Sequence, residues 1–163
     1  MQFAHLGIAV FVIGVTMVGA YQEEKDVRML AGETVSVGGY QIQLEGVRSV
    51  PGPNYNAMRG TFLLSKNGSN QTTLYPEKRS YFSSSMPMTE AAIDAGLTRD
   101  IYVSLGEELE DKSWAVRVYY KPFVDWIWGG CLLMALGGIF AISDKRYRMK
   151  LKRQISWKQS FLF

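Results

Sequence analysis

The sequence has 163 residues, a formal net charge of +3, one histidine and one cysteine. A chain of this length holds one modest domain in addition to any membrane-spanning segments. One histidine and one cysteine exclude a His/Cys metal cluster, a CxxC redox pair and a catalytic triad built from this chain alone. The composition therefore does not predict an enzyme that is active by itself.

The net charge conceals an uneven distribution along the chain. Residues 144–163 hold seven Lys or Arg residues against one Asp, a net of +6, whereas the rest of the chain has a net of −3. A nucleic-acid-binding protein is typically recognised by a basic patch or stripe on its folded domain. Because the basic residues here are concentrated in a C-terminal tail, we expect no nucleic-acid partner.

The first predicted element is an uncharged, apolar stretch from Phe3 to Ala20 that contains His5. About eighteen helical residues extend roughly 27 Å, which is just sufficient for a thin hydrocarbon core, so we expect residues 1–20 to form a transmembrane helix. A cleaved signal peptide is the alternative, because residues 18–20 include the small residues of a cleavage site. The lack of a basic residue before the run favours retention. Since the run begins abruptly, we expect the chain to be one piece of something larger.

Residues 21–122 are polar and are predicted to form a strand-rich domain. Tyr40, Ile42 and Leu44 alternate with polar residues, which is typical of a half-buried strand. Residues 21–28 read as a charged exit segment, and residues 89–94 as a short helical turn at most. We expect five or six short strands with turns at 51–54 and 67–68, within residues 32–39, 40–45, 55–66, 71–75, 101–105 and 114–120. This pattern predicts a small antiparallel β-sandwich or barrel-like domain.

A second apolar stretch follows Pro122, and we expect residues 123–142 to form a second transmembrane helix. Its only charged residue, Asp125, lies in the first turn. Trp126 and Trp128 follow it, near the start of the helix, where aromatic side chains typically lie at the membrane–water interface. The stretch also holds small residues that would allow a neighbouring helix to approach closely, at Gly129, Gly130, Gly137 and Gly138.

The predicted basic tail spans residues 143–163. Positively charged segments next to a membrane helix are retained on the cytoplasmic side. We therefore expect this tail to be cytoplasmic and residues 21–122 to lie on the other side of the membrane. The fold class predicted from the sequence is a membrane protein with two transmembrane helices flanking a small antiparallel β-domain.

His5 is the principal candidate functional residue, because an ionisable side chain within a membrane span is costly in lipid. One interpretation is structural: the imidazole reaches the lipid head groups or bonds to a neighbouring helix. The other is an axial ligand to haem iron, since neutral imidazole in an apolar helix bundle is the usual protein ligand for haem. A single histidine supplies one axial position only.

Two further groups of residues each allow two interpretations of their role. Met86 and Met88 flank a proline in a predicted loop, where they would act as apolar packing residues or as soft metal ligands. The Trp and Tyr residues at 114–128 would form part of the core and anchor the chain at the interface. Alternatively, they would form an exposed aromatic face for a flat ligand or a partner segment.

Seven sequence blocks are distinctive. They are Ala-His-Leu-Gly at 4–7, Glu-Lys-Asp-Val-Arg-Met at 24–29, Gly-Pro-Asn-Tyr at 52–55, Pro-Glu-Lys-Arg at 76–79, Met-Pro-Met-Thr-Glu-Ala-Ala-Ile-Asp at 86–94, Arg-Asp-Ile-Tyr-Val at 99–103 and Trp-Ala-Val-Arg-Val-Tyr-Tyr-Lys-Pro-Phe at 114–123. In these blocks the chain resembles the C-terminal part of CcmF, the haem-lyase membrane protein of the cytochrome c maturation system. The blocks occur in the family's order and cover nearly the whole chain, and the block at 86–94 is especially specific.

The resemblance implies a function that composition and spacing do not. CcmF receives haem from the haem chaperone CcmE and, with CcmH, attaches it to the CxxCH motifs of apocytochrome c. The family also holds a b-type haem between two transmembrane histidines, one of them in a context like residues 4–7. This implies that His5 is one axial ligand of haem b. It also implies a multi-pass protein of the inner (cytoplasmic) membrane with residues 21–122 in the periplasm.

The sequence also departs from the family. It lacks the tryptophan-rich haem-handling segment, the two periplasmic histidines and the second haem b histidine. We therefore expect a split or truncated form that is inactive alone and packs through its glycine faces against an N-terminal CcmF portion. The alternative function is a non-catalytic, membrane-anchored assembly module that docks CcmH or apocytochrome c without binding haem.

Overall fold

The computed structural model describes residues 2–84 and 86–143. The chain divides into two compact units, which are described separately. One unit comprises Met1–Thr16 together with the C-terminal part of the chain from Asp125, and the other comprises Met17–Val124. The basic tail predicted at 143–163 falls outside the described residues from position 144 onward.

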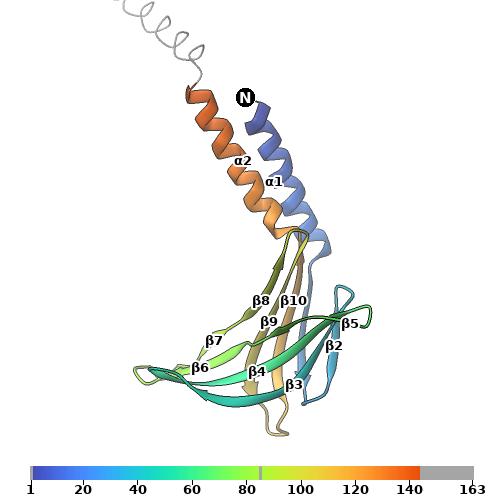
Figure 1. Ribbon diagram of the computed structural model, residues 1–163, viewed down its shortest axis with the longest axis vertical. Coiled ribbons are helices and arrows are strands. Elements are labelled where there is room, and N and C mark those ends of the chain that lie inside the picture. The colour runs from blue at the N-terminus through green and yellow to red at the C-terminus, as the bar shows by residue number, and fades with distance from the viewer. Residues whose placement is uncertain (1, 85, 144–163) are drawn as a thin grey trace, which may run out of the picture. The chain divides into compact units, whose positions relative to one another are not determined.

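The first unit contains most of two long apolar helices, α1 (Gln2–Tyr21) and α2 (Val124–Ser143). Both are long and apolar enough to cross a membrane. Most of their large side chains are exposed, as expected for helices whose apolar surface faces lipid or further helices. The two helices flank the β-domain in the sequence (Figure 1), which confirms the predicted fold class.

Glycines allow the backbones of α1 and α2 to approach each other closely. A Cβ atom built on Gly130 would lie 2.6 Å from the backbone nitrogen of Phe11, and one on Gly137 would lie 2.5 Å from that of Ala4. Two glycines of α1 are matched in the same way: a Cβ atom on Gly7 would lie 2.6 Å from the Met134 nitrogen, and one on Gly14 would lie 2.9 Å from the Ile127 nitrogen. These four pairs run in opposite directions along the two helices, so the pair is antiparallel.

The expectation that the glycines of α2 pack against a separate partner is therefore wrong for Gly130 and Gly137. These two residues contact α1 of the same chain. Gly129 and Gly138 are different, because no atom lies within 4 Å of the Cβ position at either residue. Only these two glycines of α2 remain on an open face.

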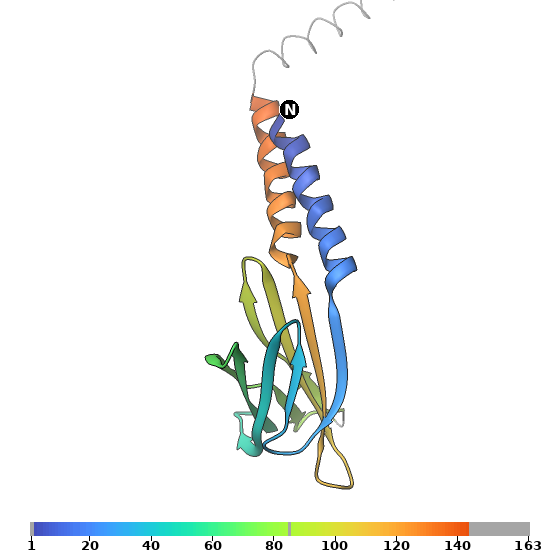
Figure 2. The ribbon, with the colours of Figure 1, turned by 90° about the vertical axis from the view of Figure 1, so that its right-hand side faces the viewer.

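Within its described residues, the second unit contains ten strands in two antiparallel sheets, whose arrangement can be followed in Figures 1 and 2. One sheet has the order β1 (Glu23–Met29), β10 (Trp114–Pro122), β9 (Arg99–Glu108) and β8 (Ala92–Gly96). The other has the order β2 (Thr34–Val37), β3 (Tyr40–Pro51), β4 (Tyr55–Lys66), β6 (Glu77–Tyr81) and β7 (Met88–Glu90), and β5 (Ser69–Leu74) pairs with β4.

The core lies between the two sheets and follows the predicted alternation. Tyr40, Ile42 and Leu44 are buried, whereas the glutamines between them are exposed. Residues from both sheets complete the same cluster, including Phe62 and Leu64 from β4 and Ile101, Val103, Leu105, Val116 and Val118 from β9 and β10. The antiparallel β-sandwich predicted from the sequence is thus confirmed.

Three details of the prediction are wrong. The domain has more strands than five or six. Residues 89–94 form parts of β7 and β8 and not a helical turn, because pairing with β6 and β9 overrides the local helix propensity of Glu-Ala-Ala. The charged segment at 21–28 includes most of β1, which pairs with β10 along its whole length. Its exposed charged side chains are typical of an edge strand, where they prevent pairing with a strand of another molecule.

A buried carboxylate joins β4 to β6. Glu77 is buried, and its oxygens accept hydrogen bonds from Arg59 at 2.5 Å and from Arg79 at 2.7 Å. Burial acts to raise the pKa of Glu77, but the hydrogen bonds and charges of the two arginines outweigh it, so the pKa is lowered overall. The ionised form of Glu77 therefore stabilises the folded domain.

We expect Glu77→Gln to lower the free energy of unfolding by about 2 kcal/mol, because it removes one partner of a mostly buried charge cluster. Since the folded pKa lies below the unfolded value, the Glu77 contribution is present above the unfolded pKa and is lost as the pH falls through the folded pKa. Urea unfolding of the full chain in detergent between pH 7 and pH 3 measures both effects. An identical acid dependence in wild type and variant would contradict this prediction.

Candidate functional site

His5 lies near the N-terminal end of α1 and is exposed. It precedes Gly7 by two positions, which corresponds to about 200° around a helix, and Gly14 by nine positions, about 180°. Because both glycines contact α2, His5 lies on the opposite side of α1. Ile8, Ala9 and Val12, which share this side, are also exposed.

The chemistry of this helix face fits one side of a haem. It presents one imidazole among small and branched apolar side chains, and imidazole is a common axial ligand of haem iron. The residues that the structure describes contain no group of three or more His, Cys, Asp or Glu residues able to hold a metal ion. His5 is the single histidine of the sequence, so a second histidine ligand for a haem held at His5 would come from another segment or chain.

A second candidate site is a hollow of about 440 Å³ on the sheet formed by β1, β10, β9 and β8. Gly106 and Ala115 line it, and both are small; a Cβ atom on Gly106 would lie only 2.9 Å from the Ala115 carbonyl oxygen. Arg117, which also lines the hollow, binds both carboxylate oxygens of Asp26, at 2.5 and 2.7 Å. The hydrogen bond from Arg117 holds the pKa of Asp26 below its usual value.

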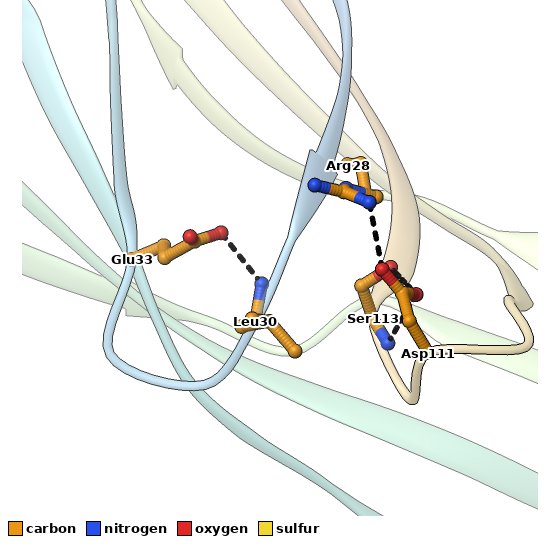
Figure 3. Close-up of polar contacts among 5 residues, drawn as sticks. All are labelled: Arg28, Leu30, Glu33, Asp111 and Ser113. Atoms are coloured by element: carbon orange, nitrogen blue, oxygen red, sulfur yellow. Dashed lines mark hydrogen bonds and ion pairs between the residues drawn. The ribbon is translucent and has the colours of Figure 1, made fainter.

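Polar contacts fix the rim of this hollow at the far end of β1 (Figure 3). Arg28 forms an ion pair with Asp111 at 2.7 Å, and Asp111 accepts hydrogen bonds from the backbone and the hydroxyl of Ser113. The hydroxyl and backbone of Ser113, followed by Arg28, lower the pKa of Asp111. In the adjacent turn, the Leu30 amide donates to Glu33 at 2.7 Å. The hollow is therefore bordered by ordered, charge-compensated groups.

The aromatic residues predicted as one group occupy several environments. Trp114 is buried in the core, whereas Trp126 and Trp128 are exposed on α2. Tyr119 packs edge-on against Tyr102 across β10 and β9, with ring centroids 5.5 Å apart. Core formation is thus confirmed for Trp114.

Met86 and Met88 do not pack in the core of the β-domain. Met86 is 77% exposed, and Met88 is also exposed. The interpretation of both methionines as packing residues is therefore wrong within the described chain. Met88 is the first residue of β7 and pairs with Arg79 of β6, so it lies in a strand and not in the predicted loop, and Met86 lies two positions before it.

Sequence reasoning missed the pairing of Asp26 with Arg117, which lie 91 positions apart. In β1 the four consecutive residues 23–26 are all charged, so the sequence shows no clear period of two that would mark one face of a strand. The partner strand is not encoded in the local pattern either.

Comparisons with known proteins agree on one family. A family model described as "CcmF C-terminal beta-sandwich" matches residues 20–122. The chain is 52% identical over 95% of its length to "Cytochrome c-type biogenesis protein CcmF" of Pseudomonas aeruginosa, and 48% identical over 94% of its length to the protein of the same name in Escherichia coli K12. In both cases it covers 24% of the relative, so it spans about a quarter of the length of these proteins.

A solved structure of "Cytochrome c Heme Lyase CcmF" has the same fold. The TM-score is 0.69 with 19% sequence identity, over 85% of this chain and 23% of that one. The two apolar helices and the family match together indicate a membrane protein. The family model covers more than half of the chain, and the chain therefore belongs to the CcmF family, of which it contains the C-terminal β-sandwich region.

Proposed function

We propose that this chain is the C-terminal part of a cytochrome c haem lyase and that His5 is one axial ligand of its b-type haem. The observation that carries the proposal is the position of His5 on an exposed, apolar side of α1 that is turned away from α2. An imidazole placed there is directed to a neighbouring helix or to a cofactor held between helices.

The names of the relatives support a role in cytochrome c biogenesis. The partners are the N-terminal portion of CcmF, which supplies the second axial ligand, together with CcmH, the haem chaperone CcmE and apocytochrome c. The protein resides in the inner membrane with its β-domain in the periplasm. The lyase activity, attachment of haem to CxxCH motifs, belongs to the assembled complex and not to this chain alone.

The residues of this chain have distinct tasks in the proposal. When bound, the haem supplies one-electron transfer. His5 would hold the haem iron through its imidazole, and the exposed apolar residues Ile8 and Val12 would keep water away from it. The close glycine contacts between α1 and α2 fix the rotation of α1, and with it the direction of His5.

The test is a comparison of the wild type with His5→Ala, each co-expressed with the N-terminal portion of CcmF. We expect the reduced-minus-oxidised visible spectrum of the purified complex to show a b-type haem in the wild type and to lose it in His5→Ala. Leu6→Ala is the matched control, since Leu6 is also exposed and cannot bind iron. In His5→Gly, added imidazole is expected to restore the signal. An unchanged haem content in His5→Ala would refute the ligand role.

The second candidate function is docking of CcmH or apocytochrome c by the β-domain without haem contact. The hollow on the β1–β10–β9 face favours it, because charged side chains such as Asp26 and Arg117 around a surface give specificity to a protein–protein contact. Equal haem signals in the wild type and His5→Ala, with the partner retained, would support this function over the first.

A further inference from the structure

The turn between β8 and β9 exposes a large apolar residue. Gly96 pairs with Arg99, so Leu97 and Thr98 form a two-residue loop. Such loops favour Gly, Asn and Asp, which suit the backbone and are polar. Leu97 is nevertheless 80% exposed, more than any other large hydrophobic residue of the described chain. Turn geometry does not account for a leucine at this tip.

The tip is held at the end of the domain that leads into α2. The backbone amide of Phe123 donates a hydrogen bond to the carbonyl of Thr98 at 2.9 Å. Phe123 directly precedes α2, and Pro122 is the register partner of Arg99. Figure 1 shows the β8–β9 turn at the same end of the β-domain as the end of β10. Leu97 therefore lies beside the point where the chain enters an apolar helix able to cross a membrane.

The stem of the hairpin is fixed to the rest of the domain. Arg99 donates to the Tyr40 hydroxyl at 2.9 Å and to the Asp94 carbonyl at 2.7 Å, and it also forms an ion pair with the Asp94 carboxylate. Because Tyr40 belongs to β3, these contacts tie the hairpin of one sheet to the other sheet. The exposed leucine is thus presented on a rigid support.

Two lysines lie near this end of the domain. The Lys66 ammonium lies 4.5 Å from the centroid of the Tyr40 ring, and Lys66 is the register partner of Tyr40. Lys121 is the register partner of Asp100, one position beyond Arg99. Lysines beside an exposed apolar residue are typical of a surface that contacts anionic lipid head groups. Along the chain, α2 begins with the exposed Trp126 and Trp128, and such residues are typical of the part of a helix that lies at a membrane interface.

We propose that the β8–β9 turn is a membrane-interface anchor. Leu97 inserts between the lipid head groups of the bilayer that α2 crosses, and Lys66 and Lys121 lie near the lipid phosphates. The anchor would limit the tilt of the β-domain on the membrane. It requires that α2 spans a bilayer, and it is independent of haem binding at His5.

The test uses nitroxide labels on single cysteines in the full chain, with the native cysteine removed by Cys131→Ala. Leu97→Cys carries the label at the tip. Leu132→Cys, an exposed position in α2, is the control for a label inside the lipid. Phe82→Cys is the control for a label in water, because Phe82 is exposed and follows Tyr81, the register partner of Tyr55 at the start of β4. The protein is reconstituted into vesicles of phosphatidylethanolamine and phosphatidylglycerol. Relaxation by oxygen, which concentrates in lipid, is compared with relaxation by a water-soluble nickel complex.

We expect the oxygen-to-nickel ratio at position 97 to be several-fold higher than at position 82 and lower than at position 132. Equal ratios at positions 97 and 82, with a high ratio at 132, would refute the proposal that the turn is a membrane anchor. The exposed turn would then be assigned to contact with a protein partner. A low ratio at position 132 would show that α2 does not span the bilayer and would overturn the anchor with it. Neither result bears on the haem spectrum, so the two proposals fail separately.

Discussion

Phe62→Ala is expected to lower the free energy of unfolding of the β-domain by about 3–5 kcal/mol. Phe62 is 0% exposed and lies in β4, where it belongs to the core cluster formed by both sheets. Truncation to alanine loses the transfer free energy of the ring and leaves a cavity that strands on both sides hold open. Urea unfolding of the full chain in detergent, followed by the β-sheet signal in circular dichroism, measures the change.

Phe82→Ala is the matched control for this prediction. Phe82 is the same residue type in the same domain but is 69% exposed. Its truncation is expected to change the free energy of unfolding by no more than about 0.5 kcal/mol. A similar loss of stability in both variants would show that the core does not lie between the two sheets as described.

Gly130→Leu is expected to separate α1 from α2. A Cβ atom at this position would lie 2.6 Å from the backbone nitrogen of Phe11, and a backbone atom cannot turn aside as a side chain can. The helices must therefore move apart, at a cost of about 1–3 kcal/mol typical of overpacking. The loss is expected to be large in a membrane, where helix association depends on close packing.

Disulfide crosslinking between the helices measures this separation. The Phe3 and Phe140 rings have centroids 6.1 Å apart, so Phe3→Cys with Phe140→Cys, in a Cys131→Ala background, places one thiol on each helix at facing positions. We expect a high yield of oxidised product, which Gly130→Leu strongly reduces. Gly129→Leu is the control, because no atom lies within 4 Å of its Cβ position, and it should retain the crosslink. A full yield in Gly130→Leu would refute the packing.

Much of the fold follows from local sequence patterns. The two apolar runs correspond to α1 and α2, because about twenty apolar residues in a row are long enough to span a bilayer only as a helix. The alternation at Tyr40, Ile42 and Leu44 predicted a strand with one buried face, and all three side chains are buried. The Asn67-Gly68 turn was predicted from its residue types, and both residues have positive φ.

The candidate site was predictable only in part. His5 was identified because it is the one histidine and lies in an apolar run. Its direction was not predictable, because the sequence offers four glycines on α2 and does not say which of them contact α1. The structure selects Gly130 and Gly137, which lie seven positions apart and so occupy one helix face. On α1 the contact is made by Gly7 and Gly14, and this places His5 on the opposite side of that helix.

By itself, the sequence determined the features that depend on neighbours in the chain: the two apolar helices, the alternating strands, the turns and the single histidine. Only the tertiary structure decided which strands pair and which surfaces meet. The charged segment containing Asp26 became a strand because β10 pairs with it, and residues 89–94 became strands because β6 and β9 pair with them. Local propensity differs by less than about 1 kcal/mol per residue, so cross-strand packing and burial between distant segments decide such cases.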